Sequence, residues 1–298
     1  MPTYFEPRTL EILLVGLGNV AIGYDLKSNV NYPKTHLISL LKYADIEGVV
    51  LNITAVEPNS VRAAEAKVRI PQLYIVKNLI DISKYKKFDI AINCVPISES
   101  IGVTKFMLDQ FEISLLVLEK PGALNSSQGL ILNRLMLEHG NSFIAYPRRA
   151  LHSSTQLKQA IESYPENSWQ VSIKFSGSKS NILCHFVDLV AFVFEDYQKI
   201  GPRSPYVSTY VQTADINNND HEVLIEGPIK ILYSGGGSSI IIQESQDIVK
   251  EINAQIEIQS QIYFSVRSYM NYFLKGEKMN FPMQIGEEVL SILGGVTP

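Results

Sequence analysis

The chain of 298 residues has few cysteines, no excess of basic charge and no long apolar run. Two cysteines, Cys94 and Cys184, are too few for a disulfide framework or a thiolate metal site. The 26 basic and 30 acidic residues leave a net charge of −4 with no basic stripe, which argues against a nucleic-acid or anionic-membrane surface. No stretch approaches the ~18 apolar residues of a membrane span, and the start of the chain lacks a signal-peptide pattern. We expect a cytoplasmic protein that binds a small molecule.

Metal binding is also not expected, because no cluster of His, Cys and carboxylate residues has metal-ligand spacing. Hydrophobic residues make up 46% of the chain and charged residues 19%, below the ~25% of typical globular proteins. This composition favours a large buried sheet. The length exceeds what one hydrophobic core usually supports, so two domains are expected.

A glycine-rich turn follows the first apolar run, Ile12–Val15. Gly16, Gly18 and Ala21 have the spacing G-x-G-x-x-A, in which the first glycine permits a tight turn and the second lets a pyrophosphate approach the backbone. Amide groups at the start of the following helix would hold the phosphates. An ordinary glycine turn has the same spacing, so the context must decide. The residues expected to contact a bound dinucleotide here are Gly16, Gly18, Asn19 and Val20.

An acidic residue ends the second expected strand, Val49–Val56. Glu57 lies 39 positions after Gly18, because a polar insertion, residues 25–36, delays this strand. In dinucleotide-binding folds a carboxylate here binds the ribose hydroxyls and repels a 2′-phosphate, so we expect NAD rather than NADP. The alternative is a solvated glutamate at a strand end.

Further continuous apolar strands alternate with helical patterns, which predicts a parallel sheet covered on both faces. The expected strands are Leu73–Val76, Asp89–Cys94, Ser114–Leu118 and Ser142–Tyr146. Ligands of such sheets bind beyond the carboxyl ends of the strands. The strand ends therefore bring Cys94, Pro96, Glu119 and Lys120 to the same crevice as the glycine turn.

The pattern changes in the second half, where strands alternate between apolar and polar residues. This alternation is typical of an open, mostly antiparallel or mixed sheet. The expected strands are Trp169–Ser176, Tyr206–Gln212, Ile229–Tyr233, Ser238–Gln243 and Ala254–Gln259, followed by helices at Gln261–Phe273 and Ile285–Leu293. The fold class is α/β, with a doubly wound domain at residues 1–121 and a second α/β domain at residues 122–298.

Two residues are candidates for proton chemistry. Lys120, at a strand end beside Pro121, is placed to donate to a substrate hydroxyl and stabilise an alkoxide, although a lysine there is often a surface charge. His185 lies at the start of an apolar helix, with Asp188 one turn later to orient it or cap the helix. A structural core histidine is the alternative.

Arg148 and Arg149 form the only adjacent arginine pair, after Tyr146 and Pro147. A guanidinium group suits a carboxylate or diphosphate, and Tyr146 combines an apolar ring with a polar tip. A surface ion pair is the alternative for at least one arginine. We include all three residues as candidate substrate contacts.

These motifs together resemble the Gfo/Idh/MocA family of glucose-fructose oxidoreductases, inositol dehydrogenases and rhizopine-catabolism proteins. The resemblance covers most of the chain, and its most diagnostic motif is Glu119-Lys120-Pro121. It implies a Rossmann domain followed by a domain with an open sheet, and assembly as a homodimer or homotetramer through that sheet. It also implies that Lys120 and His185 take the family's catalytic roles, and that Asn181 stands where several dehydrogenases have Asp.

The resulting hypothesis is an NAD-dependent oxidoreductase that acts on a sugar or nucleotide sugar, with surface-polysaccharide biosynthesis as the setting that the shorter relatives suggest. Asn181 cannot accept a proton, and Ser98-Glu99-Ser100 lacks a histidine common in the family. Two alternatives therefore stay open. One is an NAD-assisted glycosidase without net redox change, and the other is a non-catalytic regulator that senses a dinucleotide or a sugar.

Overall fold

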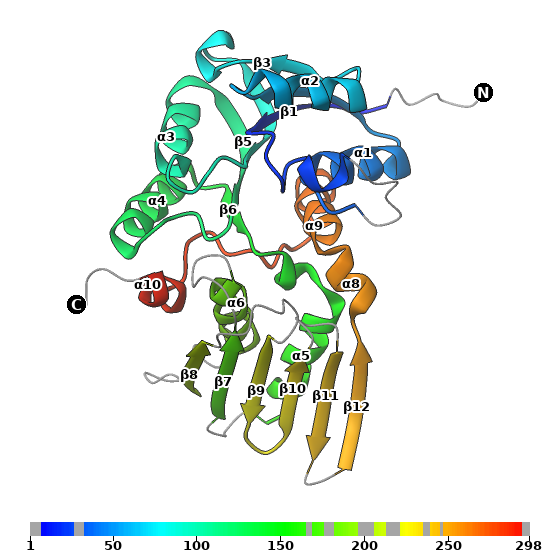
Figure 1. Ribbon diagram of the computed structural model, residues 1–298, viewed down its shortest axis with the longest axis vertical. Helices are drawn as coiled ribbons and strands as arrows, with labels where there is room; N and C mark the ends of the chain where they lie inside the picture. The colour runs from blue at the N-terminus through cyan, green and yellow to red at the C-terminus, as the bar shows by residue number, and fades with distance from the viewer. Residues whose placement is uncertain are drawn as a thin grey trace.

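Two six-stranded sheets make up the molecule in the computed structural model (Figure 1). The structure describes residues 7–26, 33–164, 169–175, 182–195, 206–212, 221–234, 239–244 and 247–293. The expected fold class is confirmed: one sheet is parallel and Rossmann-like, and the other is mixed and mostly antiparallel. Within the described part of the chain, no helix is both long and apolar enough to cross a membrane.

The first sheet has the strand order β3-β2-β1-β4-β5-β6 with all neighbours parallel. Its strands are β1 (Thr9–Val15), β2 (Val50–Val56), β3 (Tyr74–Val76), β4 (Lys87–Asn93), β5 (Glu112–Glu119) and β6 (Ser142–Ala145). The order reverses between β1 and β4. A sheet wound this way opens a crevice at that point, beyond the carboxyl ends of the strands.

Both faces of this sheet are buried, as its continuous apolar strands require. Ile12 and Leu14 of β1 belong to one apolar core with α1 and α9, whereas Leu13 and Val15 pack in another core with α3 and α4. The helices around the sheet are α1 (His36–Glu47), α2 (Ser60–Arg69), α3 (Ser100–Gln110), α4 (Ser126–His139) and α9 (Gln261–Lys275), with 3-10 turns η1 (Gly23–Asp25), η2 (Leu79–Asp81) and η3 (Pro147–Ala150). Helix α2 was not predicted, because Ala66 is its only buried residue.

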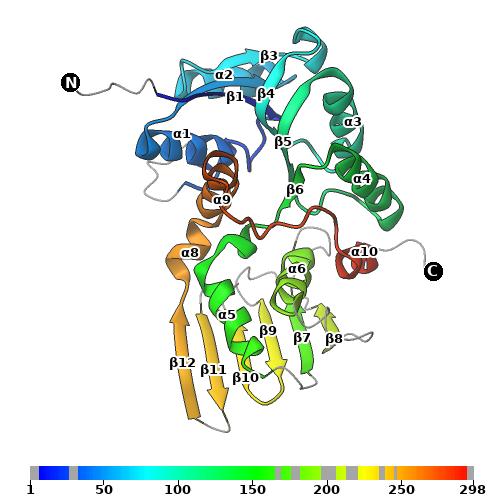
Figure 2. The same ribbon diagram turned by 180° about the vertical axis from the view of Figure 1, so that it is seen from behind.

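The second sheet has the order β12-β11-β10-β9-β7-β8, in which only β7 and β8 are parallel. Its strands are β7 (Trp169–Phe175), β8 (Tyr206–Gln212), β9 (Glu222–Glu226), β10 (Lys230–Ser234), β11 (Ser239–Glu244) and β12 (Asp247–Asn253). Helices α5 (His152–Glu162) and α6 (Cys184–Val193) cover one face (Figure 2). Residues of β7 alternate between buried and more exposed positions, as the sequence pattern predicts.

The strand predicted at Ala254–Gln259 is wrong, because Gln255–Gln259 form helix α8. Ile256 and Ile258 alternate as in a strand, but so short a run does not distinguish the two structures. The edge strand is instead β12, which is almost entirely exposed and has no apolar face to reveal it in the sequence. The amide of Gln255 donates to Asn253 Oδ1 and turns the chain from β12 into α8.

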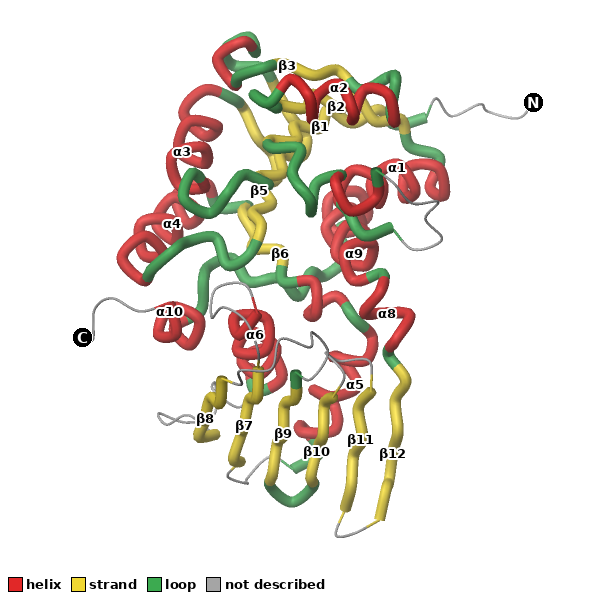
Figure 3. Tube along the Cα trace, in the orientation of Figure 1, coloured by secondary structure: helices red, strands yellow, loops and turns green. Residues whose placement is uncertain are grey.

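The two halves of the chain interleave (Figure 3). Strand β6 lies beyond residue 121 yet completes the first sheet, and α9 returns from the second half to pack on α1. The segment after α9 also reaches this sheet, where Ile144 N donates to Pro282 O at 3.1 Å, before α10 (Glu287–Leu293) ends the described chain beside α6. The division at residue 121 stays a prediction about folding units.

A buried hydrogen bond connects α1 and α9. Tyr43 donates to Asn271 Oδ1 at 2.7 Å, and burial, followed by the nearby Glu47 and Glu277 carboxylates, raises the pKa of Tyr43 to about 12. The phenol is therefore a protonated donor in the folded protein. Asn271 in turn donates to Glu277 at 2.9 Å, so the bond anchors the end of α9.

We expect Tyr43→Phe to lower the free energy of unfolding by about 1 to 3 kcal/mol, because it leaves Asn271 Oδ1 buried without its donor. Urea unfolding followed by circular dichroism measures the change. Tyr74→Phe is the matched control, because Tyr74 is exposed on β3, and its stability should stay within about 0.5 kcal/mol of the wild type. Equal stability of the two variants would contradict the role of this bond.

Candidate functional site

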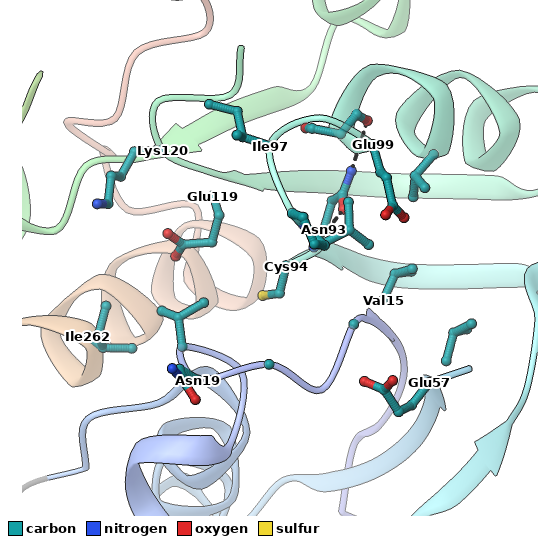
Figure 4. Close-up of a pocket in the computed structure, with 18 of the residues that line it drawn as sticks. Val15, Asn19, Glu57, Asn93, Cys94, Ile97, Glu99, Glu119, Lys120 and Ile262 are labelled. Carbon is teal, nitrogen blue, oxygen red and sulfur yellow. Dashed lines mark hydrogen bonds between the residues drawn. The ribbon is translucent and has the colours of Figure 1, made fainter. Parts of the chain in front are cut away.

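A cleft of about 1260 Å³ runs along the carboxyl ends of β1, β2, β4 and β5. Its other wall comes from the start of α6 and from α8 and α9, so both halves of the chain contribute. Figure 4 shows several of its side chains. The sequence-predicted residues that line it are Gly16, Gly18, Asn19, Val20, Glu57, Cys94, Pro96, Glu119, Lys120 and His185. Tyr146, Arg148 and Arg149 do not line it, and Asn181 lies outside the described residues.

The two glycines of the turn differ in what surrounds them. Gly16 has φ +85°, and a β-carbon on it would lie 3.0 Å from the carbonyl oxygen of Cys94. A side chain here meets both an unfavourable backbone conformation and a neighbouring strand. Gly18, by contrast, has no atom within 4 Å of the place where a β-carbon would stand. The fold therefore requires Gly16, whereas Gly18 leaves open space at the cleft.

The helical turn after the glycines continues into α1 across the insertion. Ile22 N donates to Gly18 O at 3.0 Å, and the amides of His36 and Leu37 donate to the carbonyls of Val20 and Ala21, also at 3.0 Å. The first turn and α1 thus form an interrupted helix rather than a helix that starts directly at the glycines.

Asp25 closes the base of this insertion. Its Oδ2 accepts hydrogen bonds from Lys34 N at 2.9 Å and from Thr35 Oγ1 at 2.6 Å, and the side chain is fully buried. These bonds hold the returning chain next to the turn that it left. The start of α1 is therefore fixed beside the cleft.

Glu57 connects the glycine turn to the end of β2. Oε2 accepts from Leu17 N and Oε1 from Asn59 N, each at 2.9 Å, and the Arg62 guanidinium lies 3.5 Å from Oε2. The side chain is buried yet lines the cleft. Each carboxylate oxygen has two lone pairs, so Glu57 can accept further bonds from a ligand hydroxyl.

Glu119 and Lys120 lie at the end of β5 (Figure 4), before a cis peptide bond to Pro121. Glu119 Oε1 lies 2.6 Å from Nε2 of His36, a buried residue that the sequence analysis did not single out. The half-buried Lys120 lines the cleft together with His185. Both residues, which come from opposite halves of the chain, line this cleft, and the positive charge of Lys120 lowers the pKa of His185.

His185 lies in the first turn of α6 and is partly exposed. Its Nδ1 is buried and has no hydrogen-bond partner among the described residues. Burial, and then the positive charges of Lys120, Arg148 and His221, hold the pKa of His185 well below its ordinary value. The imidazole is therefore neutral at pH 7 and can accept a proton.

The expectation that Asp188 orients His185 or caps the helix is wrong. Asp188 accepts three hydrogen bonds from the Arg149 side chain, at 3.0, 2.9 and 2.7 Å, and both side chains are buried. Opposite charges in a dry interior must pair closely, and this pair connects η3 to α6. Arg149 therefore has a partner within the protein.

Arg148 is also buried, among aromatic rings. It donates to the hydroxyl of Tyr233, and its guanidinium lies 4.7 Å from the ring centroid of Phe186. The Tyr146 hydroxyl is buried without a hydrogen-bond partner among the described residues, and burial raises its pKa well above the usual value. The roles of Tyr146, Arg148 and Arg149 as substrate contacts stay predictions.

Sequence reasoning missed the residues that reach the cleft from the insertion and from the far end of the chain. These are Tyr24, Lys34, Ile258, Gln259, Gln261 and Ile262. No local pattern marks the residues of α8 and α9 as cleft residues, because only the return of α9 to α1 brings them there. His36, at the first position of α1, carried a weak signal as a histidine next to a helix start.

No protein-family model matches the chain, and neither does any curated protein sequence. Solved structures do match. An oxidoreductase from Agrobacterium radiobacter, in complex with NAD+, L-tartaric acid and magnesium, has a TM-score of 0.69 and 10% identity over 95% of this chain and 94% of that chain. The WlbA dehydrogenase from Chromobacterium violaceum, in complex with NADH and UDP-GlcNAcA, has a TM-score of 0.65 and 18% identity over 98% of this chain and 94% of that chain. A super-repressor mutant of Gal80p from Saccharomyces cerevisiae has a TM-score of 0.67 and 12% identity over 96% of this chain and 90% of that chain.

The chain has the Gfo/Idh/MocA fold. The resemblance stated from the sequence is confirmed at this level, and it extends over both sheets. Because identities of 10% to 18% establish the fold alone, the chemistry of this chain must be argued from its own cleft.

We expect Asp188→Asn to lower the free energy of unfolding by about 3 kcal/mol or more, because it leaves the Arg149 guanidinium buried without its charge partner. Urea unfolding measures the loss. Glu138→Gln is the control, because it breaks an exposed pair with Arg134 and should change stability by less than about 0.5 kcal/mol. If Asp188→Asn unfolds at the wild-type urea concentration, the pair has no structural role.

Proposed function

We propose that the protein is an NAD-dependent oxidoreductase that transfers a hydride between the nicotinamide ring and a hydroxyl-bearing carbon of a sugar or nucleotide sugar. The observation that carries this proposal is the presence of Lys120 and His185 in the lining of one cleft that also contains the glycine turn. An amine and a neutral imidazole at one place are the groups that alcohol oxidation needs. The dinucleotides and the nucleotide sugar in the structural relatives support the choice of ligands.

The cleft fits a dinucleotide at the end formed by β1 and β2. The open space at Gly18 leaves room for a pyrophosphate against the turn, and the amides of the following turn lie beside it. Glu57 stands where ribose hydroxyls bind in such folds, and its negative charge favours NAD over NADP. Asn19, Val20, Cys94 and Pro96 complete the proposed binding surface.

When bound, the nicotinamide supplies the hydride acceptor or donor. The Lys120 amine donates a hydrogen bond to the substrate oxygen and stabilises negative charge that develops on it. His185 takes the hydroxyl proton through Nε2, because Nδ1 is buried. Its lowered pKa keeps the imidazole unprotonated at neutral pH, so Nε2 is available as the acceptor. Ile258 and Ile262 add apolar side chains to the lining of the cleft.

A regulator that binds a dinucleotide without turnover is the second candidate. Two observations favour it: Asp188 is bound to Arg149 and does not support His185, and the fold is shared with a repressor, Gal80p. Tight NADH binding without hydride transfer to or from any member of a broad sugar and nucleotide-sugar panel would support this candidate over the enzyme. An NAD-assisted glycosidase would instead release sugar without a lasting change in NADH absorbance.

We expect Gly18→Val to weaken NADH binding by roughly tenfold or more, since the added side chain fills the space left for the pyrophosphate. Its melting temperature should stay near that of the wild type, because a β-carbon at this position has no protein atom within 4 Å. Isothermal titration calorimetry measures the binding. Gly102→Val on α3 is the control, because Gly102 also has open space around it but lies outside the cleft. Wild-type affinity in Gly18→Val would refute the dinucleotide position.

We expect Lys120→Met to lower kcat on an active sugar substrate by about 10² to 10⁴, the range for loss of one acid–base group, with NADH affinity nearly unchanged. Stopped-flow absorbance at the NADH band separates hydride transfer from binding. Lys105→Met is the control, because Lys105 pairs with Asp109 on the outer surface of α3. Loss of NADH binding with retained turnover would contradict the role of Lys120.

A further inference from the structure

His36 is a fully buried histidine that the proposed chemistry does not use. It begins α1, directly after the insertion, and its amide continues the helical turn that starts at Gly18. Burying an imidazole costs free energy unless both ring nitrogens have hydrogen-bond partners. The partners of His36 therefore indicate which residue it positions.

Both nitrogens of this ring have partners. Nε2 lies 2.6 Å from Glu119 Oε1, and Nδ1 lies 3.4 Å from the hydroxyl of Tyr269 on α9. Burial raises the pKa of Tyr269 well above its usual value, so the phenol stays protonated and can donate to Nδ1. Nε2 then carries the hydrogen and donates to the carboxylate. The His36 and Tyr269 rings also stack, with their centroids 6.3 Å apart.

Of the three connected residues Tyr269, His36 and Glu119, only Glu119 lines the cleft. Its side chain is 12% exposed and lines the cleft beside Lys120. Figure 4 shows its carboxylate turned toward the side on which Lys120, Asn19 and Ile262 lie. The proposed catalytic group Lys120 therefore lies on the side toward which this carboxylate points. His36 itself does not line the cleft, so any influence on a ligand must pass through Glu119.

We propose that His36 is a positioning residue, which holds the Glu119 carboxylate as a hydrogen-bond acceptor for the nicotinamide end of the bound dinucleotide. This inference rests on the proposed function. The short bond from Nε2 orients one carboxylate oxygen, and the contact with Tyr269 keeps the imidazole from turning away. A carboxylate held before the ligand arrives loses less freedom on binding, which improves affinity.

The test is a double-mutant cycle read by NADH affinity. We expect His36→Leu to weaken NADH binding about tenfold, the effect of losing a hydrogen bond to a charged group. In a Glu119→Ala background, His36→Leu should weaken NADH binding less than about twofold, because the carboxylate that His36 positions is then absent. An equal loss in both backgrounds, or no loss in the wild-type background, would overturn the proposal.

Two further variants keep the test valid if His36→Leu does not fold. The side-chain amide nitrogen of glutamine reaches about as far as Nε2, whereas that of asparagine is shorter. We expect His36→Gln to bind NADH within about threefold of the wild type and His36→Asn to be weakened about as much as His36→Leu. Equal affinities of the Gln and Asn variants would count against the proposal.

His139 provides the matched control. It ends α4 and is another histidine with both nitrogens bonded, Nδ1 to Ser142 Oγ at 2.7 Å and Nε2 to Ile113 O at 2.8 Å, at the ends of β5 and β6 opposite to the cleft. His139→Leu should leave NADH affinity unchanged. If the wild type itself binds no NADH, the proposed function fails and the inference fails with it. If the wild type binds but the cycle shows no coupling, only the inference fails.

Discussion

The packing of α9 against α1 is the contact on which the site depends. Helix α9 lies more than 200 positions after α1 in the chain, yet Val266, Tyr269 and Met270 are buried in the same core as Leu37 and Leu40. This burial is an apolar contact of the kind that contributes most to folding. Because α8 and α9 form one wall of the cleft, the same contact brings the second half of the chain to the carboxyl edge of the Rossmann sheet.

Carboxylates organise the first half of the site by accepting hydrogen bonds within the protein. Glu57 holds the amide of Leu17 between the two glycines, Asp25 holds the end of the insertion, and Glu119 is held by His36. A carboxylate that is removed from water needs such donors. The surroundings of a ligand are therefore set before it binds, which is the condition for both tight binding and well-aligned chemistry.

The second half of the site is organised differently, around cations. Arg148 and His221 lie beside the ring of Phe186, the residue that follows His185, and Lys120 lines the cleft from the first half of the chain. Burial, and then the positive charges of these three residues, lower the pKa of His185 and keep it neutral. Arg149 is adjacent in sequence to Arg148, but it belongs to an ion pair with Asp188. Two neighbouring arginines thus have different surroundings, which no spacing in the sequence indicates.

The parallel sheet could be predicted almost completely because its strands are buried on both faces and appear as continuous apolar runs. Strands β1, β2, β4 and β5 were each predicted within a few residues of their observed bounds. The edge strand β12 could not be predicted, because it has almost no buried face, and α8 was mistaken for a strand because its short run alternates.

The candidate site likewise has a part that the sequence predicts and a part that it does not. The glycine turn, Glu57 and Lys120 follow the ends of predicted strands, and strands of a parallel sheet end at a common edge, so the sequence alone determined that these residues gather there. Only the tertiary structure decided the rest: that His185 lines the same cleft as Lys120, that Asp188 pairs with Arg149, and that His36 lies behind Glu119. These pairings join residues 39 to 83 positions apart, and packing of apolar faces determines them rather than any local pattern of the chain.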